Sequence, residues 1–413
     1  MDQLNSLKLE LVNHMRHEVN NSISNSDDLI DSAGTLQAFA ECAEAVAATT
    51  KKLQKAAILG AYLATLSDAD LTRAARYFAG QQFALTDART TNVGGSIISA
   101  ALSEATGFSL EDLYPRYVRL GDPGELAAEI IKETKRTFQP TITLVETELL
   151  ISRLSETRGI KNKTRLLAAI LHRASPLEAK YLVKLLAGDL RIGLREGLVE
   201  DAIARVFEQS LADVSYANML LGDIGETAIR ARVGDLRDVN MRLFHPIKFM
   251  LATPAADLTD VARTMPEEFL VEDKFDGIRA QAHVEAGRTA IYSRTMDEIT
   301  HRFPELIDPL RSLATDVIID GEIIPASDEV ILPFSELQKR LGRKNVGSQL
   351  MKAVPVVLVA YDLLYAGGKV LIDQALSERR HLLGQLVPDR GPLRMSRGKL
   401  LSDAAMLDGE FEL

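Results

Sequence analysis

The sequence predicts a multidomain protein in which an all-α region is followed by an α+β region with largely antiparallel strands. Apolar residues recur at helical spacing almost throughout from Leu36 to about Leu236, the pattern of amphipathic helices. Beyond about residue 245 the chain changes to short β-rich runs punctuated by Gly and Pro. A length of 413 residues also favours two or three domains. We therefore expect a polar, mobile extension over 1–35, a helical domain over 36–236 and an α+β domain over 237–413.

Two helices of the first domain have readable ends. Ser67 suits an N-cap, and Gly80 suits the left-handed residue that ends the same helix. Ser175 begins a second helix, with Pro176 at the first helical position and Glu178 completing a capping box. No internal repeat is evident.

The second domain is predicted from alternating β-rich and helical stretches. Antiparallel strands are typical of such short runs joined by turns. The expected strands are 269–272, 280–284, 289–293, 316–320 and 356–361, and helices are expected around 334–342 and 376–387.

The composition excludes several classes of protein. Cys42 is the only cysteine, which excludes an internal disulfide framework and a multi-cysteine zinc site. No apolar run is long enough to cross a bilayer, and the N-terminus lacks the pattern of a secretion signal, so we expect a cytoplasmic protein with no membrane partner. The net charge of −10 argues against nucleic-acid binding by the whole surface, but local positive patches still allow it.

Lys274 is the residue with the most specific chemical context. It follows a predicted strand and precedes Asp276-Gly277. Lysine becomes a nucleophile when desolvation or nearby cations deprotonate it, and Gly277 permits a tight turn against a phosphate-bearing ligand. Alone, the motif is more often a surface turn with a solvated lysine.

Four further elements follow Lys274 in order. They are Arg279, Arg294 at the end of a predicted strand, Asp320-Gly-Glu322, and Tyr361 at the start of Tyr-Asp-Leu-Leu-Tyr. Each alone could be structural: an exposed arginine, a hairpin corner or a core aromatic residue. The ordered set is a stronger signal than any of its members.

This set resembles the nucleotidyltransferase motifs of ATP-dependent DNA ligases, a superfamily shared with RNA ligases and mRNA-capping enzymes. The resemblance implies an ATP-grasp-like ligase domain with ATP and Mg²⁺ as cofactors, in which Lys274 attacks the α-phosphate of ATP and holds AMP. It also implies that Glu272 accepts a hydrogen bond from the adenine amino group, that Arg279 and Arg294 bind phosphates, that Glu322 contacts the ribose and the metal, and that Tyr361 stacks on adenine. Electrostatic stabilisation of phosphoryl charge agrees with these residue types.

The helical region resembles the DNA-binding domain of the larger ligases. The resemblance rests on residues 188–204 and 91–107. Glycines before helix starts expose backbone N–H groups, and Arg191 and Arg195 supply charge for DNA phosphates. Inter-helix turns with solvated arginines are the alternative. A second basic segment, Lys339, Arg340, Arg343 and Lys344, is expected to face DNA or to be a solvated helix end, with equal weight.

The resemblance covers residues 36–413 and stops early. A Glu-Gly-x-x-x-Lys motif, a lysine-rich strand and an OB-fold domain, which the family places after Tyr361, do not occur in this sequence. We therefore expect a truncated adenylation domain, poorly active by itself, from a monomeric ligase whose partner is nicked double-stranded DNA. The alternatives are a non-catalytic nick- or duplex-binding protein and an RNA end-joining enzyme.

Overall fold

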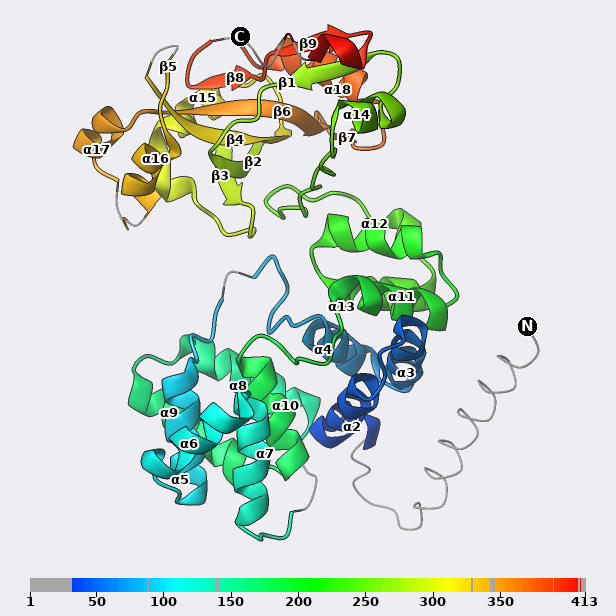
Figure 1. The fold of residues 1–413 in the computed structure, drawn as a ribbon, viewed down its shortest axis with the longest axis vertical. Helices are drawn as coiled ribbons and strands as arrows, with labels where there is room; N and C mark the ends of the chain where they lie inside the picture. Colours follow the sequence, from blue (N-terminus) through cyan, green and yellow to red (C-terminus); the bar gives the residue numbers. More distant parts are fainter. Residues whose placement is uncertain are drawn as a thin grey trace. The chain divides into compact units, whose positions relative to one another are not determined.

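The chain forms two compact units, one ending at Val239 and the other starting at Asn240 (Figure 1). The computed structural model describes residues 32–87, 89–138, 142–327, 330–341, 343, 346–388, 390–407 and 409. Most of the predicted extension over 1–35 lies outside the described residues. Among those described, every helix is too short or too polar to cross a bilayer.

The first unit is helical, as predicted. The Ser67 hydroxyl accepts from the Asp70 N–H at 3.2 Å, and Gly80 has φ +77° after the helix. Ser175 and Glu178 form the predicted capping box. The helices of the unit are α2 (Leu36–Ala47), α3 (Lys52–Ala64), α4 (Asp68–Phe78), α5 (Gly95–Thr106), α6 (Leu110–Leu120), α7 (Pro123–Glu133), α8 (Leu144–Glu156), α9 (Ile160–Arg173), α10 (Pro176–Leu186), α11 (Glu196–Val206), α12 (Leu211–Leu221) and α13 (Ile224–Val233).

These helices form an internal repeat that the sequence analysis missed. Helix caps recur at similar offsets of 108 and 101 residues: Thr35 and Thr143 (143 − 35 = 108), and Asp122 and Asp223 (223 − 122 = 101). The run Leu-Gly-Asp-x-Gly-Glu occurs at 120–125 and again at 221–226. Helices α2 to α7 therefore correspond in order to helices α8 to α13.

The two repeats exchange helices, since α4 packs on α13 and α10 packs on α7. Equivalent ion pairs join the exchanged helices: Arg76 Nη2 lies 2.6 Å from Asp223 Oδ2, and Lys184 Nζ lies 3.1 Å from Asp122 Oδ2. In both pairs the aspartate is the N-cap of the partner helix. Each repeat thus completes its core with helices of the other.

The second unit is an α+β domain built on a largely antiparallel sheet. The strand order is β3-β2-β4-β6-β7, with β5 beside β4 and β8 parallel to β6, while β1 and β9 form a separate pair. The strands are β1 (Phe269–Glu272), β2 (Ile278–Glu285), β3 (Arg288–Ser293), β4 (Val317–Ser327), β5 (Val330–Ile331), β6 (Val356–Ala366), β7 (Lys369–Val370), β8 (Leu393–Met395) and β9 (Gly398–Leu401); the helices are α14 (Leu258–Thr264), α15 (Ile307–Arg311), α16 (Phe334–Leu341), α17 (Ser348–Ala353) and α18 (Leu376–Leu386). Every predicted strand and both predicted helices are present.

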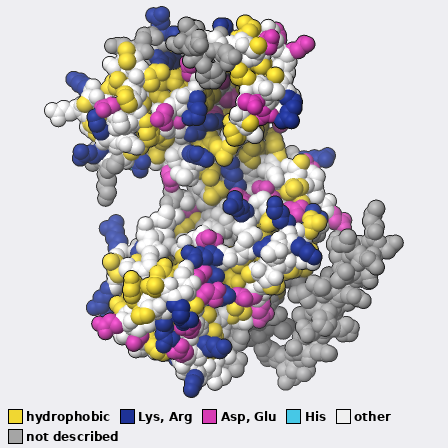
Figure 2. All heavy atoms as spheres, in the orientation of Figure 1, with side chains coloured by type: hydrophobic (Ala, Val, Ile, Leu, Met, Phe, Trp, Pro, Cys, Tyr) yellow, Lys and Arg dark blue, Asp and Glu magenta, His cyan; other side chains and the backbone are white. Residues whose placement is uncertain are grey.

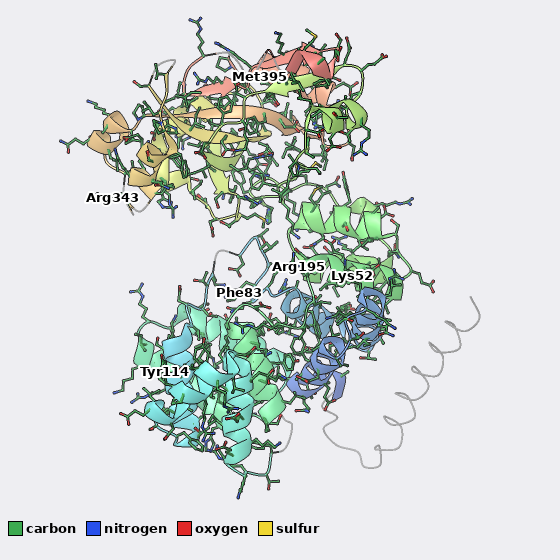
Figure 3. All side chains as sticks on the ribbon, viewed as in Figure 1. Lys52, Phe83, Tyr114, Arg195, Arg343 and Met395 are labelled. Carbon is green, nitrogen blue, oxygen red and sulfur yellow. The ribbon has the colours of Figure 1, made fainter. Side chains whose placement is uncertain are left out.

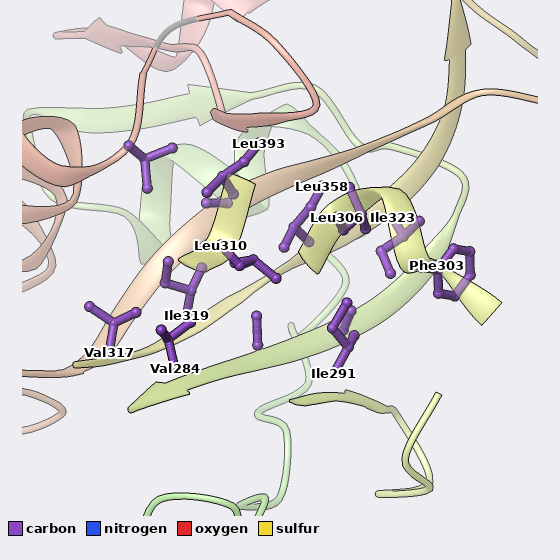
Figure 4. Close-up of a cluster of buried hydrophobic side chains, with 14 of the residues drawn as sticks. Val284, Ile291, Phe303, Leu306, Leu310, Val317, Ile319, Ile323, Leu358 and Leu393 are labelled. Atoms are coloured by element: carbon purple, nitrogen blue, oxygen red, sulfur yellow. The ribbon is translucent and has the colours of Figure 1, made fainter. Parts of the chain in front are cut away.

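One face of this sheet carries the main hydrophobic core of the unit. Phe303, Leu306 and Leu310, from the turn and helix that follow β3, pack against residues of β2, β4 and β6 (Figure 4). All three side chains are fully buried. The burial of large apolar side chains, about 1.5–3 kcal/mol each, fixes the strands whose ends carry the candidate site.

A buried polar network on β2 and β3 holds the segment that enters the second unit. His283 Nδ1 accepts from the Phe244 N–H at 3.0 Å, and His283 Nε2 donates to Gln281 Oε1 at 2.8 Å. Gln281 Oε1 also accepts from the Ile247 N–H at 2.9 Å, and the Tyr292 hydroxyl donates to the Phe244 carbonyl at 3.1 Å. Burial lowers the pKa of His283 to about 3, so the ring is neutral and uses both nitrogens.

We expect this histidine to make folding of the second unit sensitive to mild acid. The unfolded chain binds a proton near the ordinary pKa of 6.5, whereas the folded chain resists protonation down to about 3. Stability from this group is therefore full above pH 6.5 and falls as the pH drops through that window, by about 1 kcal/mol at pH 5.5. Urea unfolding followed by circular dichroism at pH 7.5 and 5.5 measures this change.

The matched control is His283→Gln, which keeps an acceptor and a donor but does not titrate. The difference between wild type and His283→Gln isolates this group from other titrating residues. An identical loss of stability in both proteins would show that His283 does not carry the effect.

Candidate functional site

Strands β2, β4 and β6 bring three of the predicted site residues together. Arg279 is the cross-strand partner of Glu322, and Tyr361 lies on β6 beside them. Arg279 forms a two-bond ion pair with Asp320, with N–O distances of 2.7 and 2.6 Å. The Arg279 guanidinium carbon also lies 5.4 Å from the centre of the Tyr361 ring. Arg279 is therefore oriented by Asp320, which takes two of its donor atoms.

Two glycines allow the strands to approach at this point. A Cβ at Gly277 would lie 2.4 Å from the Ile323 carbonyl oxygen and 2.9 Å from Glu322 Cγ. A Cβ at Gly321 would lie 2.3 Å from the Val359 carbonyl oxygen. Real Cβ atoms do not come this close to backbone atoms, so each Gly is required by close approach of the neighbouring strand.

Lys274 lies in the loop between β1 and β2, and its side chain is exposed. Its charge acts on Glu322, where it opposes the effect of burial. Burial nevertheless raises the pKa of Glu322 above its ordinary value. The Tyr361 hydroxyl approaches Glu322 Oε2 at 3.4 Å, which is long for a hydroxyl donor. The carboxylate thus keeps capacity to accept from, or coordinate, a further group.

The Tyr361 ring lies nearly parallel to the Phe275 ring. The interplanar angle is 15° and the centroids are 6.5 Å apart. Phe275 directly follows Lys274, so an aromatic residue of the lysine loop accompanies the aromatic residue of β6. Sequence reasoning passed over Phe275, although its place next to the lysine was the available signal.

Glu272 ends strand β1 and is held by Arg380 of α18. Arg380 Nη1 donates to Glu272 Oε1 at 2.6 Å. Arg380 was not predicted, because nothing local in the sequence links it to a residue 108 positions earlier. Its neighbour Arg379 pairs with Asp362 through two bonds of 2.7 and 2.8 Å. The structure thus brings Arg279, Glu322 and Tyr361 together and links Glu272 to the Tyr361 strand through Arg380, with Lys274 in the adjoining β1–β2 loop. Phe275 and Arg380 are the residues that the structure adds. Arg294 follows β3 directly and is exposed.

The predicted DNA contact at Arg340 is corrected by the structure. Arg340 is fully buried and pairs with both oxygens of Glu305. It also donates to the Val354 and Arg302 carbonyls at 2.9 and 2.8 Å. A guanidinium with these buried partners is part of the core and cannot reach DNA. Lys339 is exposed and pairs with Glu336, Arg343 is exposed (Figure 3), and Lys344 lies outside the described residues.

In the helical unit, helix starts gather in two equivalent pairs. Lys55, in the first turns of α3, donates to the Ile192 carbonyl just before α11, and Lys163 of α9 donates to the Thr91 carbonyl just before α5. Both lysines are buried. None of these four helices has a side-chain N-cap hydrogen bond. Each pair therefore presents uncapped backbone N–H groups, which attract anions.

Exposed cations lie beside both pairs of helix starts. Lys52 and Arg195 accompany the α3–α11 pair (Figure 3), and Arg158 and Lys161 accompany the α9–α5 pair. Of these only Arg195 was predicted. Arg191 is exposed but partly engaged, since its Nη1 donates to the Gly121 carbonyl at 2.7 Å. On the face shown in Figure 2, basic and acidic side chains are otherwise interspersed.

The second unit is thus an antiparallel sheet that gathers a carboxylate, an arginine and a tyrosine beside a loop that carries a lysine. Residues 249–412 match the family described as ATP dependent DNA ligase domain, and residues 35–204 match the DNA ligase N terminus family. The chain belongs to the ATP-dependent DNA ligase family.

Individual relatives agree with this assignment. The chain is 43% identical over 357 residues to a probable DNA ligase of Koribacter versatilis, covering 86% of this chain and 62% of that protein. It is 31% identical over 379 residues to a DNA ligase of Methanosphaerula palustris, covering 90% of this chain and 67% of that protein. The solved structure "Pmar-Lig_PreS3" has a similar fold, with a TM-score of 0.53 at 15% identity, over 91% of this chain and 69% of that one.

Proposed function

We propose that the protein containing these residues seals nicks in double-stranded DNA, with ATP as cosubstrate and Lys274 as the residue that carries AMP. The observation that carries this proposal is the convergence of Arg279, Glu322 and Tyr361 on strands β2, β4 and β6, beside the β1–β2 loop that carries Lys274. As a ligase it acts on DNA inside the cell, as a monomer.

The chemistry proceeds in three balanced steps. The Lys274 Nζ, having lost a proton to solvent, attacks the α-phosphorus of ATP; a P–N bond forms, the α–β P–O bond breaks, and pyrophosphate leaves. An oxygen of the 5′-phosphate at the nick then attacks the AMP phosphorus; a P–O bond forms, the P–N bond breaks, and the Lys274 amine leaves and takes up a proton. Finally the 3′-hydroxyl attacks that 5′-phosphate, a phosphodiester bond forms and AMP leaves. Positioned cations stabilise the charge on the phosphoryl oxygens in each step.

The surrounding residues have matching roles in this proposal. Tyr361 supplies a ring face for adenine and Glu272 accepts from its amino group. Arg279, already oriented by Asp320, directs its remaining donor atom to phosphate oxygens, and exposed Arg294 contacts phosphate from the end of β3.

Magnesium fits this site as an ion shared with the nucleotide. Among the described residues, no group of three or more His, Cys, Asp or Glu side chains could hold a metal by itself. Glu322 offers a half-buried carboxylate with acceptor capacity, and Mg²⁺ commonly uses one or two carboxylates together with substrate phosphates. When bound, the ion neutralises phosphate charge while Glu322 orients it.

The helical unit supplies the proposed grip on the duplex. Its two equivalent pairs of helix starts, with Arg195 in one and Arg158 in the other, bind phosphates without reading the bases. Arg191, Lys339, Arg343 and Lys344 are proposed as further phosphate contacts.

Replacing Arg195 or Arg158 by alanine is expected to weaken DNA binding equally for all sequences. Each loss should reduce the slope of log K against log salt by about 1, the value for one phosphate contact. Fluorescence anisotropy with nicked duplexes at several salt concentrations measures this. Arg205→Ala is the control. Arg205 is an exposed residue of α11, the helix whose N-cap residue is Arg195, but it forms an ion pair with Asp201 at 2.8 Å. Equal effects at Arg205 would contradict the assignment.

The test of the proposed function is transfer of label from α-labelled ATP, followed by peptide mapping. The expected result is AMP on the peptide that contains Lys274, and sealing of a nicked duplex by the protein that contains these residues. DNA binding without labelling by ATP would favour the non-catalytic alternative.

A further inference from the structure

Arg380 lies where three elements meet beside the proposed adenine site. Its Nη1 donates to Glu272 Oε1 at 2.6 Å and to the Tyr361 carbonyl at 3.3 Å. Its Nη2 donates to the Ser396 carbonyl at 2.8 Å. The Arg380 side chain is only 11% exposed. One arginine of α18 thus joins strand β1, strand β6 and the segment between β8 and β9.

These contacts constrain Glu272 more than its own strand does. Glu272 is the last residue of a four-residue strand, and its side chain is 28% exposed. A charge-assisted bond of 2.6 Å to the largely buried side chain of Arg380 selects one orientation of the carboxylate. It occupies Oε1 and leaves Oε2 able to accept from another donor. Because the same arginine holds the Tyr361 backbone, the orientation of the carboxylate is tied to the position of the stacking residue.

We propose that Arg380 is a positioning residue that sets the preference of the site for adenine. This inference rests on the proposed function, which assigns Glu272 to the amino edge of the base. Held by Arg380, Glu272 presents Oε2 to the 6-amino group of adenine. Guanine would place its O6 acceptor against the carboxylate, and two acceptors facing each other in a partly buried site are unfavourable.

The experiment compares ATP with purine riboside triphosphate, which lacks only the 6-amino group. Calorimetric titration gives both dissociation constants, and labelling gives both rates of lysyl-nucleotide formation. Wild-type protein should prefer ATP by about tenfold or more, the range for a hydrogen bond to a charged group. Arg380→Leu should lose most of that preference through weaker ATP binding, with little change for purine riboside triphosphate. The double variant with Arg380→Leu and Glu272→Gln should show no further loss of the preference for ATP.

Two further variants separate positioning from general stability. Arg380→Lys keeps the charge and can make one of the bonds, so part of the preference should return. Arg379→Lys alters the neighbouring ion pair with Asp362. It should change the dissociation constants of both nucleotides by the same factor.

The outcomes are distinct. If Arg380→Leu lost affinity for both nucleotides by the same factor, Arg380 would have only a structural role and the inference would be overturned. A wild-type protein that is labelled but shows no preference for the 6-amino group would overturn it while leaving the ligase chemistry intact. A wild-type protein that neither binds nor is labelled by either nucleotide would overturn the proposed function, and this inference with it.

Discussion

Replacing Lys274 by alanine is expected to reduce labelling by α-labelled ATP to background. The proposed covalent bond forms at Nζ, and alanine has no atom there. Lys274→Arg should fail equally, because a guanidinium remains protonated and is not nucleophilic. The arginine variant keeps the positive charge near Glu322, so ATP binding should survive while labelling is lost. Gel autoradiography gives the labelling and calorimetry gives the binding.

Lys352→Ala is the matched control, since Lys352 is an exposed lysine of α17 in the same unit. It should be labelled like wild type. Label that persists in Lys274→Ala and maps to another residue would show that the nucleophile has been assigned wrongly, even though the reaction class would stand.

Replacing Arg340 by alanine is expected to destabilise the second unit by about 3 kcal/mol, at the lower end of the range for removing one partner of a buried ion pair. The change leaves Glu305, which is 23% exposed, without its ion-pair partner. It also removes the hydrogen-bond donors to the Val354 and Arg302 carbonyls. Urea unfolding followed by circular dichroism measures the free energy.

Arg343→Ala provides the contrast for this prediction. Arg343 is exposed in the same basic segment, so its removal should leave stability unchanged and weaken DNA binding. If Arg340→Ala unfolds like wild type and loses DNA affinity instead, then Arg340 is a surface contact and the buried arrangement is wrong.

The elements and the core of the site could be predicted because their signals are local. Short β-rich runs punctuated by Gly and Pro marked β2, β3, β4 and β6. The motifs on these strands became neighbours once the strands paired. Arg279 and Glu322, for example, are opposed across β2 and β4. Register between antiparallel strands thus converts an ordered set of motifs into a cluster.

The residues that were missed depend on distant partners. Arg340 looks like any basic residue at a helix end, and its burial is decided by Glu305, 35 positions earlier. The role of Arg380 likewise depends on its hydrogen bond to the distant Glu272. The internal repeat was missed for a different reason: its two halves share helix caps and glycine turns rather than long identities. Comparing the sequence with itself at offsets of 101 and 108 would have found it.

The exchange of helices between the repeats has a consequence for how such a domain could have arisen. A chain with only α2 to α7 would leave the face of α4 that packs on α13, and the face of α7 that packs on α10, without a cover. Its Arg76 and Asp122 would also lack their ion-pair partners. Such a half-length ancestor would have to pair with a second copy that donates the same helices in return. Gene duplication and fusion would then have turned a dimer with exchanged elements into one polypeptide, free to vary its two pairs of helix starts separately.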